Sequence, residues 1–234
     1  MLTNQYRPKV CIVDYGLGNL FSILNACNLS DLDAQVSSNA SDITSAEIVI
    51  LPGVGSYSVA MDSLRSLDLI SPLKEAASTS LLIGICLGMQ LLMNESHEFG
   101  VHEGLGLING KTIGISSSMQ ENTVKVPHIG WNRIRGSHGH NKYKNHPELW
   151  NQTPLEGIPN NQFMYFIHSY YVLPDDPTIT LSTTVYGSTE FVSSLKYKNI
   201  YGFQFHPERS GSSGIKMYDN LRNIATNLKE SGHV

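Results

Sequence analysis

The stretch SLLIGICLGMQLLM, residues 80–93, places a cysteine where an apolar run meets two glycines. The run SLLIGI is typical of a strand buried on both faces, and LGMQLLMNES predicts a helix that begins directly after Cys86. Gly84 and Gly88 stand two residues before and after the cysteine. This is the spacing of a nucleophile elbow, G-x-nucleophile-x-G, with cysteine in the place of serine. The stretch therefore predicts a strand–turn–helix unit and a candidate nucleophile.

Strand-like and helix-like segments alternate through the rest of the first half. They are the strand-like residues 10–16 (VCIVDYG), the helix-like residues 19–29, a short strand within 34–43, the strand-like residues 46–55 and the helix-like residues 61–78. This alternation predicts a doubly wound α/β sheet, with the functional site outside the carboxyl ends of its strands.

The second half is β-rich. From about Gly110 to Phe205 the chain reads as strands separated by polar turns, and the polar residues 135–157 predict an excursion on the surface. Apolar residues at helical spacing within 213–232 predict a last helix that packs on the sheet. One domain over residues 1–234 is the economical interpretation, with residues 1–9 as a flexible N-terminus, and an α/β layer joined to a β layer is the alternative.

Composition limits the classes of function. A net charge of -4 with 41% hydrophobic residues gives no field that would hold nucleic acid or an anionic membrane. Three cysteines are an odd number in a chain too long to be a disulfide scaffold, which favours a reducing compartment. No segment resembles a signal peptide or a membrane span. We expect a cytoplasmic protein.

Cys86 is the strongest candidate for chemistry. A thiol beside a helix N-terminus lies near the positive end of the helix dipole, which favours the thiolate, and near N–H groups that can meet an oxyanion. The alternative is a structural thiol at a strand–helix junction. That alternative fits Cys11 and Cys27 better, because neither is flanked by glycines.

A cysteine nucleophile needs a base and a group that orients the base. His206 ends an apolar strand in QFHPER, and Glu208 follows two residues later, on the same side of an extended segment. The spacing suits a Cys-His-Glu triad. A strand that ends at the surface with a solvated glutamate would show the same sequence pattern. Among the other histidines, His138, His140 and His146 are most simply surface residues, and His168 is most simply a satisfied histidine on a packed face.

Two glycine-containing turns follow strands. LPGVG, residues 51–55, frees backbone N–H groups that could complete an oxyanion hole, or is a simple turn. DYGLGNL, residues 14–20, superficially matches a dinucleotide fingerprint, but Phe21 stands where the third glycine belongs. We therefore expect a plain strand-to-helix turn there.

The segments GICLGMQ, LPGVG, PHIGWN, FIHSYY and QFHPERS together resemble the glutaminase subunits of imidazole glycerol phosphate synthase, which are class I (triad-type) glutamine amidotransferases. The resemblance runs from Val10 to about Leu228. It implies a flavodoxin-like α/β fold, a mostly parallel sheet flanked by helices with an added antiparallel β-rich part. It also implies no cofactor and no metal.

The resemblance assigns roles to individual residues. The catalytic residues would be Cys86, His206 and Glu208. The oxyanion hole would involve Leu87, Val54 and Gly55, and the substrate would contact Gln90, Glu98 and Gly53. A partner interface would include Pro127, His128, Trp131, Asn132, Tyr170, Tyr171 and Arg209, so we expect exposed aromatic side chains at a contact surface.

In this family the substrate is L-glutamine, and the ammonia passes through a channel to a (βα)8-barrel cyclase that makes imidazole glycerol phosphate and AICAR. We expect a heterodimer with such a cyclase. Two departures from the family pattern, Arg209 after HPE and SYSVAM after PGVG, instead resemble paralogues that supply ammonia for amidination of surface sugars. A stand-alone cysteine hydrolase and a non-catalytic binding module remain alternatives of other classes.

Overall fold

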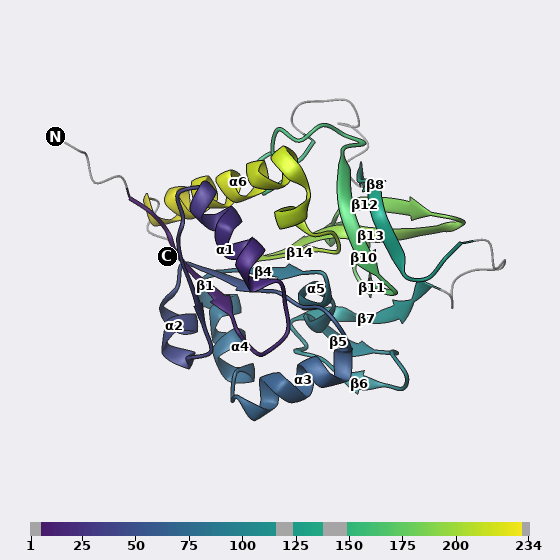
Figure 1. The fold of residues 1–234 in the computed structure, drawn as a ribbon, viewed down its shortest axis with the longest axis horizontal. Coiled ribbons are helices and arrows are strands. Elements are labelled where there is room, and N and C mark those ends of the chain that lie inside the picture. The colour runs from purple at the N-terminus through teal and green to yellow at the C-terminus, as the bar shows by residue number, and fades with distance from the viewer. Residues whose placement is uncertain (1–5, 116–123, 138–148, 231–234) are drawn as a thin grey trace.

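A computed structural model describes residues 6–115, 124–137 and 149–230. Its centre is an eight-stranded sheet (Figure 1), in which five neighbouring strands are parallel and the last three are antiparallel. In order across the sheet the strands are β2 (Asp33–Ser37), β1 (Lys9–Val13), β3 (Ile48–Leu51), β4 (Leu81–Ile85), β14 (Ile200–Phe203), β13 (Thr189–Tyr197), β12 (Thr180–Tyr186) and β9 (Arg135–Gly136). The predicted mostly parallel α/β sheet is confirmed.

Helices cover both faces of the sheet because its central strands are apolar on both sides. Strands β3 and β4 are buried along their whole length. Helices α1 (Leu20–Leu29) and α6 (Gly211–Glu230) lie on one face, and α2 (Ala40–Ser45), α3 (Tyr57–Ser66) and α4 (Ile70–Thr79) lie on the other (Figure 1). Two apolar clusters result, one on each side of the sheet.

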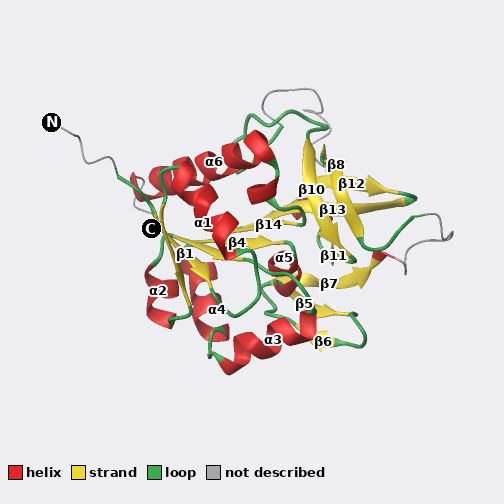
Figure 2. Ribbon diagram, in the orientation of Figure 1, coloured by secondary structure: helices red, strands yellow, loops and turns green. Residues whose placement is uncertain are grey.

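Two smaller sheets accompany the main sheet (Figure 2), and the second half of the chain, which was predicted to be β-rich, also supplies β14, β13, β12 and β9 to the main sheet. One of the smaller sheets pairs β8 (His128–Arg133) with β10 (Phe163–His168). The other contains β11 (Tyr170–Pro174), β7 (Ile108–Gly114), β5 (Met93–Ser96) and β6 (His102–Glu103). Short 3-10 turns, η3 (Pro177–Ile179) and η4 (Pro207–Arg209), follow β11 and β14.

Three local predictions were wrong. The expected helix over 61–78 is two helices, α3 and α4, which are separated by a turn where Asp68 has φ 55°. The helix after Cys86, α5, spans only Leu87–Leu91, because Met93–Ser96 pairs with β7 instead. Sheet pairing there outweighs the helical spacing of the leucines. Helix α2 was not predicted.

The polar excursion is also more closely packed than expected at its C-terminal end. Leu149 and Trp150 are buried, and the Trp150 indole Nε1 donates to Leu181 O at 3.0 Å. The histidines predicted at the surface, His138, His140 and His146, lie outside the described residues. Residues 1–5 also lie outside them, whereas Tyr6 and Lys9 hydrogen-bond to Glu47. Within the described ranges, no helix combines the length and the apolar character needed to cross a membrane.

Candidate active site

The elbow places Cys86 at the carboxyl end of β4, directly before α5. The cysteine has φ 54° and ψ -109°, a strained conformation for a residue with a side chain. Its N–H donates to Phe203 O of β14 at 2.7 Å. A Cβ on Gly84 would lie 2.8 Å from the Cα of Met89, and a Cβ on Gly88 would lie 1.9 Å from Leu51 O. The flanking glycines therefore serve close packing of the turn.

His206 and Glu208 lie at the end of the neighbouring strand. β14 pairs with β4 in parallel register, and the chain then enters η4, where Pro207 is at the first position. His206 Nδ1 and Glu208 Oε1 are 2.8 Å apart, and both side chains are almost fully buried. His206 Nε2 and Glu208 Oε2 have no hydrogen-bond partner with normal geometry among the described residues. The carboxylate thus orients the ring and leaves Nε2 available.

The electrostatics of His206 suit proton transfer. Burial by itself lowers the His206 pKa, but the charge and hydrogen-bonding capacity of Cys86, followed by those of Glu208, raise it to about 10. Among the described residues, the imidazole nitrogen Nε2 has no partner beside the neutral thiol, so it can take the proton of Cys86. Once the thiol is ionised, the resulting imidazolium is stabilised by the thiolate. Burial and the charge of Asp42 raise the pKa of Cys11 to about 11, and burial raises that of Cys27 to about 12.

The LPGVG segment lies against the elbow. A Cβ on Gly53 would meet the Tyr15 hydroxyl at 2.7 Å and the Leu87 Cβ at 2.8 Å. Tyr15, from the DYGLGNL turn, donates its hydroxyl to Pro52 O at 2.7 Å. The DYGLGNL turn therefore holds the LPGVG segment in place, so the role of the DYGLGNL motif is structural.

A cavity of about 470 Å³ opens over Cys86. Its lining contains five of the residues to which the resemblance assigned oxyanion or substrate roles, namely Val54, Gly55, Leu87, Gln90 and Glu98. The Glu98 carboxylate accepts a hydrogen bond from the Tyr57 N–H at the start of α3, and Gln90 Nε2 donates to Tyr170 O at 2.8 Å. The structure thus brings Cys86 and most of the candidate oxyanion and substrate residues to one cavity, whereas His206, Glu208 and Gly53 do not line it.

The candidate interface residues divide into exposed and buried ones. Trp131 is 54% exposed and packs edge-on against Tyr165, and the Arg209 guanidinium lies over the same tyrosine ring. Pro127 and Tyr170 lie at the cavity wall. His128 and Tyr171, in contrast, are buried within the chain. The expectation of an exposed aromatic surface therefore holds for Trp131 and not for Tyr171.

Gln204 is a site residue that was not predicted. It is fully buried, and its side-chain amide Nε2 lies 3.7 Å from Cys86 Sγ. Its side chain is neither titratable nor a glycine, so an amide two residues before His206 carries no signal of its own. Its place on the extended segment that carries His206 could have indicated it.

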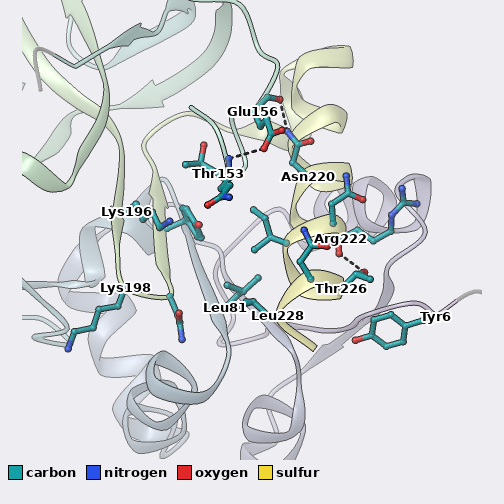
Figure 3. Close-up of a pocket in the computed structure, with 16 residues that line it drawn as sticks. Tyr6, Leu81, Thr153, Glu156, Lys196, Lys198, Asn220, Arg222, Thr226 and Leu228 are labelled. Carbon is teal, nitrogen blue, oxygen red and sulfur yellow. Dashed lines mark hydrogen bonds between the residues drawn. The ribbon is translucent and has the colours of Figure 1, made fainter. Parts of the chain in front are cut away.

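A second cavity, of about 880 Å³, lies at the opposite end of β4, where Leu81 begins that strand. Figure 3 shows α6 along one side of it, with Asn220, Arg222 and Thr226 projecting from that helix. Lys196 and Lys198 face it from the β13–β14 hairpin. It contains no cysteine or histidine. Neither cavity holds a group of three or more described side chains suited to bind a metal.

Comparison with known proteins agrees with this geometry. The family model "Glutamine amidotransferase class-I" matches residues 11–222. The chain belongs to the class-I glutamine amidotransferase family. This amidotransferase is 42% identical over 213 residues to the imidazole glycerol phosphate synthase subunit HisH of Sulfurimonas denitrificans, covering 91% of this chain and 96% of the relative. It is 38% identical over 222 residues to the subunit of that name from Aquifex aeolicus, covering 94% and 99%.

Solved structures support the fold of this amidotransferase. PurLQS from Thermotoga maritima matches with a TM-score of 0.66 and 20% identity over 93% of this chain and 99% of that chain. A crystal structure of a glutamine amidotransferase matches with a TM-score of 0.66 and 13% identity over 92% and 98%. At these identities the likeness shows the fold alone.

Proposed function

We propose that this chain is the glutaminase subunit of an imidazole glycerol phosphate synthase, and that it hydrolyses L-glutamine with Cys86, His206 and Glu208. The observation that carries the proposal is the buried His206–Glu208 pair beside Cys86 at a strained elbow, in a chain of the class-I family. The names of the relatives support the histidine-biosynthesis destination. The working compartment would be the cytoplasm.

The chemistry follows from the positions of these groups. His206 takes the proton of Cys86, and the thiolate attacks the side-chain carbonyl carbon of glutamine. The N–H of Leu87 and those of the segment at Val54 and Gly55 stabilise the oxyanion of the tetrahedral intermediate. The C–N bond breaks as His206 gives its proton to the departing ammonia, which leaves a glutamyl thioester. Water, deprotonated by His206, attacks the thioester and releases glutamate.

Three residues would hold the glutamine. Gln90 and Glu98 line the cavity from the elbow helix and from the loop after β5, and Gly53 keeps the neighbouring wall close. A partner cyclase of the (βα)8-barrel type would dock on the rim of the cavity and take the ammonia. Trp131 and Arg209, which share contacts with Tyr165, are the exposed anchors of that surface.

The test is glutamate release by the purified chain, alone and with the cyclase of the same host and the ligand of that cyclase. We expect strong stimulation by the liganded cyclase and loss of turnover in Cys86→Ala. Full turnover in Cys86→Ala would contradict the assignment. Stimulation by a sugar-amidating synthase instead of the cyclase would move the destination to the paralogous pathway that Arg209 and SYSVAM suggest. Hydrolysis of peptides without a partner would favour a stand-alone hydrolase.

A further inference from the structure

Cys86 Sγ has two polar neighbours besides the histidine. One is the backbone carbonyl of Ile167, at 3.6 Å, and the other is the amide Nε2 of Gln204, at 3.7 Å. A carbonyl oxygen can accept a bond from the neutral S–H, but it repels a thiolate. A thiolate at this position therefore loses one favourable contact and needs a donor in its place.

The Tyr170 carbonyl determines how the side-chain amide of Gln90 is oriented, and through Gln90 how that of Gln204 is oriented. A carbonyl oxygen can only accept, and this one faces Gln90 Nε2 at 2.8 Å and His168 Nδ1 at 2.8 Å. Gln90 therefore presents its NH₂ group there. The same Nε2 lies 3.2 Å from Gln204 Oε1, so Gln204 accepts from Gln90 with its oxygen. The NH₂ group of Gln204 is consequently the end that faces the sulfur.

The same reasoning shows which ring nitrogen of His168 carries the hydrogen. Its Nδ1 donates to Tyr170 O, so in the neutral ring Nε2 is an acceptor, and it lies 3.0 Å from His128 Nδ1. His128 Nε2 then accepts from the Asn132 amide at 3.3 Å. The orientation of Asn132 is set independently, because its Oδ1 accepts from the Arg133 N–H at 2.8 Å. In this series of hydrogen bonds, every donor meets an acceptor only if both histidines are neutral. Burial favours the neutral form, because it lowers the pKa of His128 to about 4.

We propose that Gln204 donates a hydrogen bond to the Cys86 thiolate, and that the Tyr170 carbonyl, acting through Gln90, holds the Gln204 amide in the donating orientation. His168 is a positioning residue that holds the Tyr170 carbonyl. The inference deepens the proposed function and rests on it for the role of the thiolate. It adds to the site a neutral donor, which stabilises the thiolate without taking over the proton transfer assigned to His206.

The experiment measures the reactivity of the sulfur without glutamine or a partner. Iodoacetamide alkylates Cys86 as a carbon–sulfur bond forms and iodide leaves, and peptide mass distinguishes this site from Cys11 and Cys27. The rate between pH 5 and pH 10 gives a midpoint for thiolate formation. Because the assay needs neither glutamine nor cyclase, a failure of glutamine hydrolysis and a failure of this inference are separate results.

Two substitutions remove the donor. Gln204→Leu deletes the amide, and Gln204→Glu places a carboxylate oxygen where the NH₂ group stands. We expect the midpoint to rise by about one pH unit in the first and by more in the second, which corresponds to roughly a tenfold slower reaction at neutral pH. Both variants keep the titratable groups around the sulfur, which are His206 with Glu208, Tyr15, Glu98, His168 and Tyr170, and Gln204→Glu adds one carboxylate that Gln204→Leu lacks.

A second pair tests the positioning role. His168→Leu removes the bond to Tyr170 O, and we expect a rise of about half a pH unit. His168→Asn keeps an N–H that can reach Tyr170 O, and we expect it to restore the midpoint. Gln35→Leu, on the exposed strand β2, is the matched control and should leave the midpoint unchanged.

Wild-type alkylation profiles in folded Gln204→Leu and Gln204→Glu would overturn the donor role. A wild-type profile in His168→Leu, or no restoration in His168→Asn, would overturn the positioning role. Thermal unfolding of each variant establishes that it is folded. If Gln204→Leu does not fold, Gln204→Glu and the His168 pair decide the question.

Discussion

The two ends of β4 carry two different cavities. The carboxyl end holds Cys86 and a cavity of about 470 Å³, and the other end opens into a cavity of about 880 Å³ (Figure 3). The smaller cavity lies beside a strained backbone and a buried, incompletely paired histidine–carboxylate pair. In the larger one, polar groups are paired with their own surroundings, as in Asn220, which donates to Pro154 O and Glu156 O.

This difference teaches that cavity size does not locate the chemistry. Backbone strain and unpaired buried polar atoms are both unfavourable for folding, and at Cys86 and the His206–Glu208 pair the two occur together. The larger cavity is also lined by two residues with positive φ, Gln152 and Lys198, but by none of the described residues that have an unpaired buried side-chain atom. Substitutions at the two ends of β4 should therefore have very different effects.

The largest contrast is between His206→Asn and Lys196→Met. Asparagine can keep a hydrogen bond to Glu208 but cannot carry a proton at Nε2, so we expect glutamine hydrolysis in the partner complex to fall on the order of 10⁴-fold. Lys196→Met removes a cation from the larger cavity and should leave turnover within about twofold. Glutamate release measures both. A large loss in Lys196→Met would mean that the larger cavity takes part in the reaction.

Glu208→Gln should have the next largest effect, roughly a thousandfold loss of turnover. Its pH profile is the more specific measurement. The charge of Glu208 helps to raise the His206 pKa to about 10, so the rate of the wild type should fall as the pH rises through that value and the imidazolium is lost. Removing the charge lowers the pKa and should move this alkaline limb to lower pH. Glu156→Gln, in the larger cavity, should leave the limb in place.

Gly88→Ala tests the packing of the elbow. The added Cβ would lie 1.9 Å from the backbone oxygen of Leu51, which cannot move without β3, so we expect a loss of about 3 kcal/mol in the free energy of unfolding. Gly157→Ala, beside the larger cavity, is the matched control. Its Cβ meets only the flexible end of Lys216 at 3.6 Å, and its φ of 71° should limit the loss to about 1 kcal/mol. Urea unfolding measures both, and equal losses would contradict this packing account.

The smallest expected effect is the loss of stability in acid caused by the buried histidines. Burial lowers the pKa of His128 to about 4, and burial together with the charge of His128 lowers that of His168 to about 3. The unfolded chain binds protons at these rings near pH 6.5 while the folded chain does not, so stability falls as the pH falls below 6.5. Between pH 6 and pH 4.5 we expect a loss on the order of 2 kcal/mol for each histidine.

Urea unfolding at several pH values measures this dependence. His168→Asn should make it less steep, whereas His97→Asn, at an exposed position, should leave it unchanged. An unchanged dependence in His168→Asn would show that other groups cause the acid sensitivity.

Local signals were enough to predict the elbow, the parallel strands and the pairing of His206 with Glu208. Each of these depends on residues close in sequence: glycines two residues from Cys86, apolar runs of strand length, and an i, i+2 pair on an extended segment. The path of residues 93–96 could not be predicted in this way. These residues leave the expected helix because β7, which is distant in sequence, offers them a pairing partner.

Short-range spacing in the sequence was enough for the α/β order and for the candidate nucleophile, base and orienting carboxylate. Only the tertiary structure decided which neutral groups surround the sulfur. Gln204, Gln90 and the Tyr170 carbonyl come from three separate segments, and the sequence does not show that these segments meet. Their donor and acceptor directions follow from contacts that exist only when β11, α5 and the end of β14 meet.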